Sequence, residues 1–255
     1  MRVVVGALLL VLGCVVTASG DSGDACDVAQ HLVHADASLT HVADAIKARS
    51  LTIAVAGTAS STLPGATGQQ LAYPAKLEAA LGKKLPDVTV KVISLVKPRQ
   101  TAQDMAQGFP RLLRDEKPAL LIWQTGTADA LLGVAAEDFQ TTLEETVDKL
   151  HSGGADVVFM NMQFSPRTDA VLSTEPYSEA LRWVGLERAV NLFDRQAVMR
   201  QWSELGTFDL LAATKSLDTA AQVHDCIARL LATLIVEAAT TDPAAQTAPK
   251  EDTKQ

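Results

Sequence analysis

Five short apolar runs, each followed by a segment with helical periodicity, constrain the fold of this chain more than any other feature. The first run, at 51–56, ends at Gly57, and a continuous apolar run closed by glycine is typical of a strand buried in a parallel sheet. Strands alternating with helices predict a parallel sheet covered on both faces, an α/β/α sandwich of three layers. Right-handed crossovers then place the site in the loops after the strand carboxyl ends. We expect strands over 51–56, 88–95, 119–125, 156–162 and 190–193.

The segments between these runs predict helices. Apolar residues recur at helical spacing from Leu32 to Ile46, so we expect one helix over 27–49. Pro110 is expected to kink or break the helix over 101–115, because proline removes a backbone donor. Residues between the first strand and Gly68 are expected to form a loop. The other helices are expected over 73–83, 137–151, 177–188, 195–204 and 219–239.

Residues 1–20 resemble a secretory signal peptide. Arg2 precedes an apolar run that is short for a membrane span, and small residues, Ala18 and Gly20, precede a cleavage site before Asp21. Lipid attachment at Cys14 and a retained membrane anchor are the alternatives. The polar segment 240–255 is expected to be a disordered tail, which leaves 21–239 as one domain. We therefore expect a periplasmic or secreted protein.

The cysteines agree with export. Removal of the leader deletes Cys14 and leaves Cys26 and Cys226. In an oxidising compartment such a pair favours a disulfide between the two ends of the domain. Two buried free thiols are the alternative.

Charge and composition exclude two broad classes. The hydrophobic content of 47% is too high for a disordered chain. The net charge of −8 argues against a nucleic-acid partner, because no Lys/Arg stripe is available to neutralise a phosphate backbone.

Several blocks resemble the SGNH (GDSL-like) hydrolases, over about residues 26–239. The sequence Gly-Thr-Ala-Ser-Ser at 57–61 follows the first strand, where that family has Gly-Asp-Ser, and Gly-Thr-Ala-Asp at 126–129 follows the third, where it has Gly-x-Asn-Asp. The segments 73–77, 154–158 and 226–230 also resemble family members. The resemblance implies a flavodoxin-like parallel sheet and a serine ester hydrolase with a His base, an Asp and an oxyanion hole.

The catalytic positions depart from that pattern. Gapless matching puts Ala59 at the nucleophile, whereas a slip of one residue puts Ser60 there. The family's Asp-x-x-His falls on 215–218, so Asp218 stands where the base should be, and His224 is the nearest imidazole. We expect Ser60 and His224 to be the catalytic pair if hydrolysis survives. Ser60 as a turn residue and His224 as a helix-face residue are the alternatives.

Other departures affect the anion-binding groups. Arg99 stands about where the family has a glycine and could clamp an anion, or be a solvated loop charge. Ala128 replaces the oxyanion Asn, while Asp129 is expected to anchor the following helix rather than act in catalysis. The residues expected to line the pocket are Gly57, Thr58, Ser61, Arg99, Thr127, Asp129, Asn161, Gln163 and Asp218.

No cofactor or metal site is expected. The chain has no Gly-x-x-x-x-Gly-Lys-[Ser/Thr], Gly-x-Gly-x-x-Gly or Gly-x-Ser-x-Gly motif. His31, His34 and His41 are expected to share one helix and to form a solvated face, since a third ligand is not placed near His31 and His34.

Three functions follow from these observations. The first is an exported SGNH-type protein that binds a ligand or an envelope partner with little or no hydrolysis. The second is a serine esterase on acyl or acetyl esters of lipid or glycan. The third is a structural envelope protein. The sequence does not name the ligand or the oligomeric state.

Overall fold

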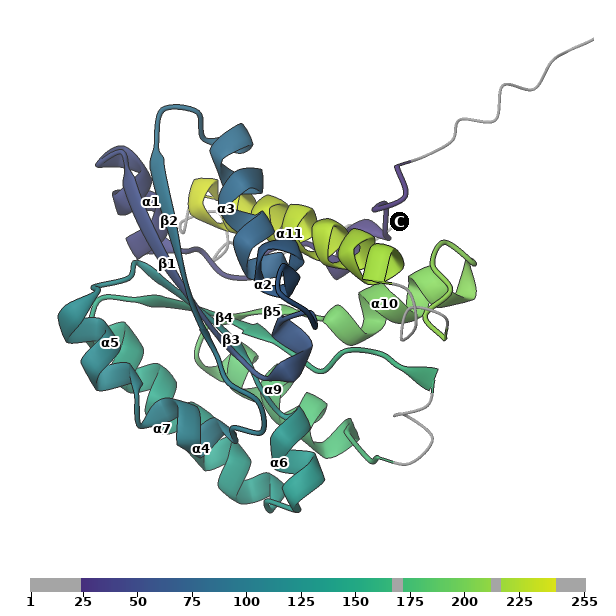
Figure 1. Ribbon diagram of the computed structural model, residues 1–255. Coiled ribbons are helices and arrows are strands. Elements are labelled where there is room, and N and C mark those ends of the chain that lie inside the picture. Colours follow the sequence, from purple (N-terminus) through teal and green to yellow (C-terminus); the bar gives the residue numbers. More distant parts are fainter. Residues whose placement is uncertain (1–23, 167–171, 212–216, 242–255) are drawn as a thin grey trace, which may run out of the picture.

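A five-stranded parallel sheet in the order β2-β1-β3-β4-β5 forms the middle layer of the structure (Figure 1). The structure is a computed structural model that describes residues 24–166, 172–211 and 217–241. All four strand pairs are parallel, which confirms the predicted α/β/α sandwich. The strands are β1 Ser50–Gly57, β2 Thr89–Val96, β3 Leu120–Gln124, β4 Asp156–Met160 and β5 Asn191–Phe193.

Alternating side chains of the central strands pack into two cores, one on each face of the sheet. In β1, Ile53 and Val55 face one core, while Ala54 and Ala56 face the other, because successive residues of a strand point to opposite faces. The first core is covered by α1 Thr40–Lys47, α3 Tyr73–Lys84, α10 Arg195–Glu204 and α11 Leu217–Thr240. The second is covered by α4 Ala102–Ala106, α5 Phe109–Asp115, α7 Ala136–Ser152 and α9 Glu175–Glu187 (Figure 1).

The amino-terminal segment is only partly helical, so the predicted helix over 27–49 is wrong. A 3-10 turn, η1 Gln30–Leu32, is followed by non-helical chain up to α1. The Asn191 side chain accepts hydrogen bonds from the backbone N–H of Asp36 (2.8 Å) and Ala37 (2.9 Å), and Asp156 accepts one from Val42 N–H (2.9 Å). The Asn191 contacts hold non-helical chain at the amino end of β5, and the Asp156 contact satisfies an N–H in the first turn of α1. His31, His34 and His41 therefore do not share one helix.

Two other expectations need correction. Pro110 does not interrupt a helix; it lies in the first turn of α5, where its missing N–H has no intrahelical partner to lose. The break between α4 and α5 falls at Gln107–Gly108 instead. The expected loop after β1 contains the 3-10 turn η2 Ala59–Ser61, and the short helices α2 Gly68–Leu71 and α6 Thr127–Leu132 were not predicted.

Helix α11 is the central helix of the first core. By length and composition alone it could cross a membrane, but its apolar residues, among them Leu231 and Leu234, are buried against the sheet and α3. These contacts account for its composition, since a helix buried in a core is apolar for the same reason as a membrane span.

A disulfide joins Cys26 to Cys226 and so ties the start of the described chain to α11. Arg229 donates a hydrogen bond to Cys26 Sγ (3.1 Å) and pairs with Asp24 beside it. The sequence predicts this disulfide. The predicted signal peptide, Cys14 and the polar tail beyond residue 241 lie outside the described residues.

Replacing both cysteines by serine should lower the free energy of unfolding. The bond closes a loop with a sequence separation of 200, and loss of such a constraint costs about 2–5 kcal/mol. Urea unfolding measures the difference, and adding a reductant to the double variant should change nothing. Equal unfolding midpoints for the oxidised unmodified protein and the double variant would show that the disulfide does not stabilise the fold.

Candidate functional site

A cavity of about 430 Å³ opens at the carboxyl ends of the strands. Residues after β1, β2, β3 and β4 line one side of it, and α10 and α11 line the other. This is the edge at which ligands bind in parallel α/β sheets. The polar residues that line it are Thr58, Ser60, Thr62, Arg99, Thr127, Gln163, Ser165, Arg195 and His224.

Gln124, the last residue of β3, organises the turn after β1. Its buried Oε1 accepts hydrogen bonds from Thr58 N–H (2.8 Å), Thr58 Oγ1 (3.0 Å) and Ser61 Oγ (3.0 Å). A buried amide oxygen needs such donors. The side chain therefore holds the η2 turn against the end of the neighbouring strand.

Gly57 allows this close approach. A Cβ atom at this position would lie 2.4 Å from Ser61 Oγ and 3.2 Å from Gln124 Oε1. Any larger residue would displace the Ser61–Gln124 hydrogen bond. Gly57 thus shapes the turn and does not bind ligand through a side chain.

Ser61 is committed to structural hydrogen bonds. Its hydroxyl lies 2.9 Å from Tyr73 Oη and 3.0 Å from Gln124 Oε1. The amide oxygen can only accept, so Ser61 donates to Gln124 and Tyr73 donates to Ser61. Ser61 is 1% exposed and does not line the cavity.

Ser60 contacts an arginine instead of a histidine. Arg195 donates from Nη2 to Ser60 Oγ (3.0 Å) and from Nη1 to the Ser60 carbonyl oxygen (3.1 Å). The guanidinium is fully buried, and this burial lowers the pKa of Arg195 to about 10. It remains charged at neutral pH, so Ser60 Oγ accepts a charge-assisted hydrogen bond.

Asn161 positions Arg195. Its side chain donates to Asp194 Oδ1 (2.7 Å) and accepts from Gln196 N–H (3.0 Å), while Asp194 caps α10 by accepting from Ala197 N–H (2.9 Å). These bonds fix the first turn of α10, from which Arg195 reaches Ser60. Asn161, expected in the pocket, is fully buried and does not line it.

His224 lines the cavity from α11 in a defined tautomer. Its Nδ1 accepts a hydrogen bond from Tyr73 N–H (3.0 Å), so the ring proton of the neutral imidazole is on Nε2. Burial, with a smaller effect of the Arg195 charge, lowers the pKa of His224 to about 3. The imidazole is therefore neutral at physiological pH.

Arg99 lies at the mouth of the same cavity. Its side chain is exposed, and its backbone adopts φ +64°, in the left-handed region that favours glycine. The chain thus keeps, at this position, a backbone conformation suited to the glycine of the resembling family. Arg99 brings a second guanidinium to the cavity.

Asp129 anchors the turn after β3. Its buried carboxylate accepts from Ala102 N–H (2.9 Å), Gly126 N–H (3.2 Å) and Thr125 Oγ1 (3.4 Å), although burial raises the pKa of Asp129. This agrees with the expected anchoring role. Thr127 and Ala128, in the same turn, line the cavity.

Asp218 is exposed on the first turn of α11 and does not line the cavity. Gln163 does line it, from the segment after β4. Within residues 24–166, 172–211 and 217–241, no three His, Cys, Asp or Glu side chains come close enough to hold a metal ion.

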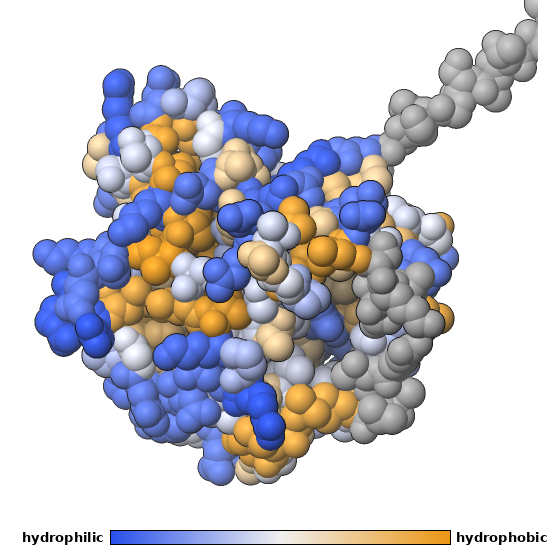
Figure 2. Space-filling view, in the orientation of Figure 1, coloured by the Kyte–Doolittle hydropathy of each residue, from blue (hydrophilic) through white to orange (hydrophobic). Residues whose placement is uncertain are grey.

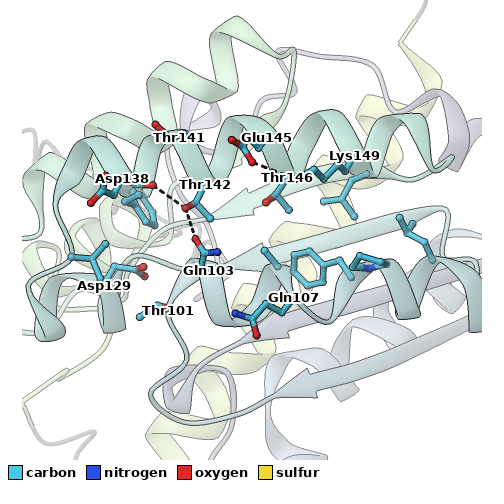
Figure 3. A pocket seen from close by; sticks show the side chains of 17 residues that line it. Thr101, Gln103, Gln107, Asp129, Asp138, Thr141, Thr142, Glu145, Thr146 and Lys149 are labelled. Carbon is cyan, nitrogen blue, oxygen red and sulfur yellow. Dashed lines mark hydrogen bonds and ion pairs between the residues drawn. The ribbon is translucent and has the colours of Figure 1, made fainter.

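A larger cavity of about 800 Å³ lies elsewhere, between α7 and the α4–α5 pair (Figure 3). Thr142 bridges it by donating to Gln103 Oε1 (3.3 Å). The described residues that line it include no serine, cysteine or histidine. The smaller cavity at the strand ends is therefore the candidate functional site.

A sequence model of the non-GDSL lipase-like family matches residues 25–241. The chain belongs to the non-GDSL lipase-like family. The match spans all described strands and both walls of the cavity. It agrees with the SGNH-type sheet, so the expected resemblance is confirmed at the level of family and fold.

Esterases are among the similar proteins. Esterase TesA of Pseudomonas aeruginosa is 31% identical over 90 residues, which are 34% of this chain and 45% of that protein. A two-domain esterase active on acetylated mannans superposes with a TM-score of 0.67 at 14% identity, over 89% of this chain and 60% of that one. A mutant of an acetyl-xylooligosaccharide esterase from Geobacillus superposes with a TM-score of 0.58 at 16% identity, over 75% of this chain and 95% of that one. These two structural likenesses show the fold alone.

Sequence reasoning missed two central residues of this non-GDSL lipase-like site. Gln124 ends β3, just before the 126–129 block, but nothing in its local sequence indicates the four hydrogen bonds that its side-chain oxygen accepts from the turn after β1. Arg195 follows a strand and an Asp cap, a pattern that predicts a helix start and not a buried cation. Only the packing of α10 on the β1 turn brings Arg195 to Ser60.

The depressed pKa of His224 predicts an acid-dependent loss of stability. Below pH 6.5 the unfolded chain protonates this histidine, while the folded state stays neutral down to about pH 3. The free energy of unfolding should therefore fall with decreasing pH in this window, by about 1.4 kcal/mol per pH unit from this group. His224→Asn should remove that slope in urea titrations between pH 6.5 and 4.

The matched control is His31→Asn, because His31 is exposed in η1. Its pH dependence should equal that of the unmodified protein. Retention of the full slope in His224→Asn would contradict a buried neutral His224.

Proposed function

We propose that this chain is an exported member of its family that binds a ligand or an envelope partner in the cavity at the strand ends, with little or no ester hydrolysis. The observation that carries the proposal is the tautomer of His224. A general base must accept the nucleophile's proton on a free ring nitrogen. Here Nδ1 is occupied by Tyr73 N–H and Nε2 carries the proton.

The nucleophile position supports the same conclusion. Ala59, which gapless matching places there, presents a methyl group at the cavity wall. Ser60, its neighbour, accepts a hydrogen bond from Arg195 and forms none with His224. Ala128 also stands in place of an oxyanion donor, and loss of one such donor costs about a hundredfold to a thousandfold in rate.

Export is supported by two independent features. The leader-like composition of residues 1–20 fits secretion, and the Cys26–Cys226 disulfide fits an oxidising compartment. Both features support the proposed periplasmic or secreted location.

A serine esterase that uses Ser60 with His224 is the competing function, and the esterases among the relatives favour it. Its substrates would be acyl esters of lipids or acetyl esters of glycans. It requires His224 to release Tyr73 and turn Nε2 into an acceptor, which the observed hydrogen bond opposes.

Ester hydrolysis should stay at background. With p-nitrophenyl acetate and butyrate, both the unmodified chain and Ala59→Ser should show no turnover, because a serine hydroxyl at 59 still lacks a base. A fluorophosphonate should label neither protein, while an active SGNH esterase serves as the positive control. Turnover that disappears in Ser60→Ala would establish the esterase function and overturn the proposal.

The intact mass of the protein, recovered from its native host or from a bacterial envelope fraction, tests whether the leader is removed and whether Cys14 carries a lipid. Cleavage before Asp21 should give the mass of residues 21–255 with one disulfide. A lipid-modified chain beginning at Cys14, or a full-length chain, would contradict secretion as a soluble protein.

A further inference from the structure

Two polar groups at the cavity wall offer hydrogens to a ligand. His224 carries its proton on Nε2 because Nδ1 is an acceptor. Ser60 Oγ accepts from Arg195, and its own hydrogen has only a contact of 3.5 Å to Gln124 Oε1, longer than usual for a hydroxyl donor. A ligand group that accepts hydrogen bonds would satisfy both donors.

The charge of the cavity has one sign. Arg99 and Arg195 line it, and none of the described residues that line it is acidic, although the chain carries a net charge of −8. Among the described residues, neither arginine forms an ion pair with a carboxylate. An anion would therefore meet a favourable local potential in this cavity.

Arg195 is a buried residue in the wall of this cavity. It is 0% exposed, and its Nε has no hydrogen-bond partner among the described residues. A buried cation without a counter-ion is unfavourable unless an anion approaches it. Ser60 links the guanidinium to the cavity, because a hydroxyl that accepts from a cation becomes a stronger donor.

Much of the remaining wall of the cavity is apolar. Leu63, Phe164, Met199, Val223 and Ile227 form much of its wall. At its rim Leu131 is 65% exposed and the adjacent Leu132 is 53% exposed, and a hydrophobic patch covers α6 at the bottom of Figure 2. An alkyl chain fits this wall, since apolar contact is favourable in proportion to the area removed from water.

We infer that the cavity binds an amphiphile as an anion: an oxyanion head, carboxylate or phosphate, held by Ser60, His224 and Arg99, with an alkyl chain along the apolar wall. This inference rests on the proposed binding function and assigns its ligand class. Ser60 then serves as a hydrogen-bond donor and not as a nucleophile. The ligand is bound without a change in covalent bonds.

Calorimetric titration of the full chain with four ten-carbon probes tests the assignment. Sodium decanoate and decyl phosphate should bind, and the tighter of the two identifies the head group. Decanol and decyltrimethylammonium should bind at least about tenfold more weakly, because they lack the charge or carry the opposite one. Raising the salt concentration should weaken anion binding.

Paired variants locate the site. Arg99→Gln and Ser60→Ala should each weaken anion binding by about tenfold or more. The controls are Arg111→Gln, an exposed arginine on α5, and Ser203→Ala on α10, neither of which lines the cavity. Both controls should bind as the unmodified chain does. Circular dichroism confirms that the variants are folded.

Different results would contradict anion binding and the non-hydrolytic function. Equal affinity for decanol and decanoate, preference for the cation, or no binding of any probe would overturn the anion assignment. Anion binding unaffected by Arg99→Gln and Ser60→Ala would overturn it as well. Hydrolysis of p-nitrophenyl decanoate that Ser60→Ala abolishes would instead overturn the non-hydrolytic function.

Discussion

The buried amide oxygen of Gln124 is the interaction on which the rest of the site depends. It gathers the Thr58 amide, the Thr58 hydroxyl and the Ser61 hydroxyl at one point, and it can do so because Gly57 has no Cβ to separate the strand end from the turn. With the turn fixed in this way, Ser61 is bound to Tyr73 and Ser60 faces Arg195. The fold itself thus sets the hydrogen-bond partners of the Ser60 and Ser61 hydroxyls.

The same network reaches the histidine. Tyr73 donates its backbone N–H to His224 and packs its ring near the imidazole, with centroids 5.8 Å apart. A catalytic histidine needs a nitrogen lone pair directed at a hydroxyl, whereas this one directs an N–H into the cavity. Together with two arginines and no acidic neighbour among the described lining residues, this N–H supports the proposed binding of an anion in place of proton abstraction.

The two ends of the sheet have different roles. Contacts at the amino ends of the strands hold the amino-terminal segment, and turns at the carboxyl ends hold the residues of the candidate site. Asn191 and Asp156 hold the amino-terminal segment at the amino ends of β4 and β5. The carboxyl ends carry short turns stabilised by Gln124, Asp129 and Asn161. Rigid turns of this kind keep polar side chains in place, which favours binding because little ordering remains to be paid on association.

The sequence by itself determined the parallel sheet, the layers and the pairing of Cys26 with Cys226, because apolar runs, helical spacing and cysteine number are local or compositional properties. It also placed Ser60, Arg99, Thr127 and Gln163 near one another, since residues after parallel strands meet at one edge, whereas His224 was added to them through the family resemblance. Only the tertiary structure decided their partners. The tautomer of His224, the burial of Arg195 and the path of residues 33–39 depend on contacts between segments distant in sequence, such as Tyr73 with His224 and Ser60 with Arg195, and local patterns carry no information about such contacts.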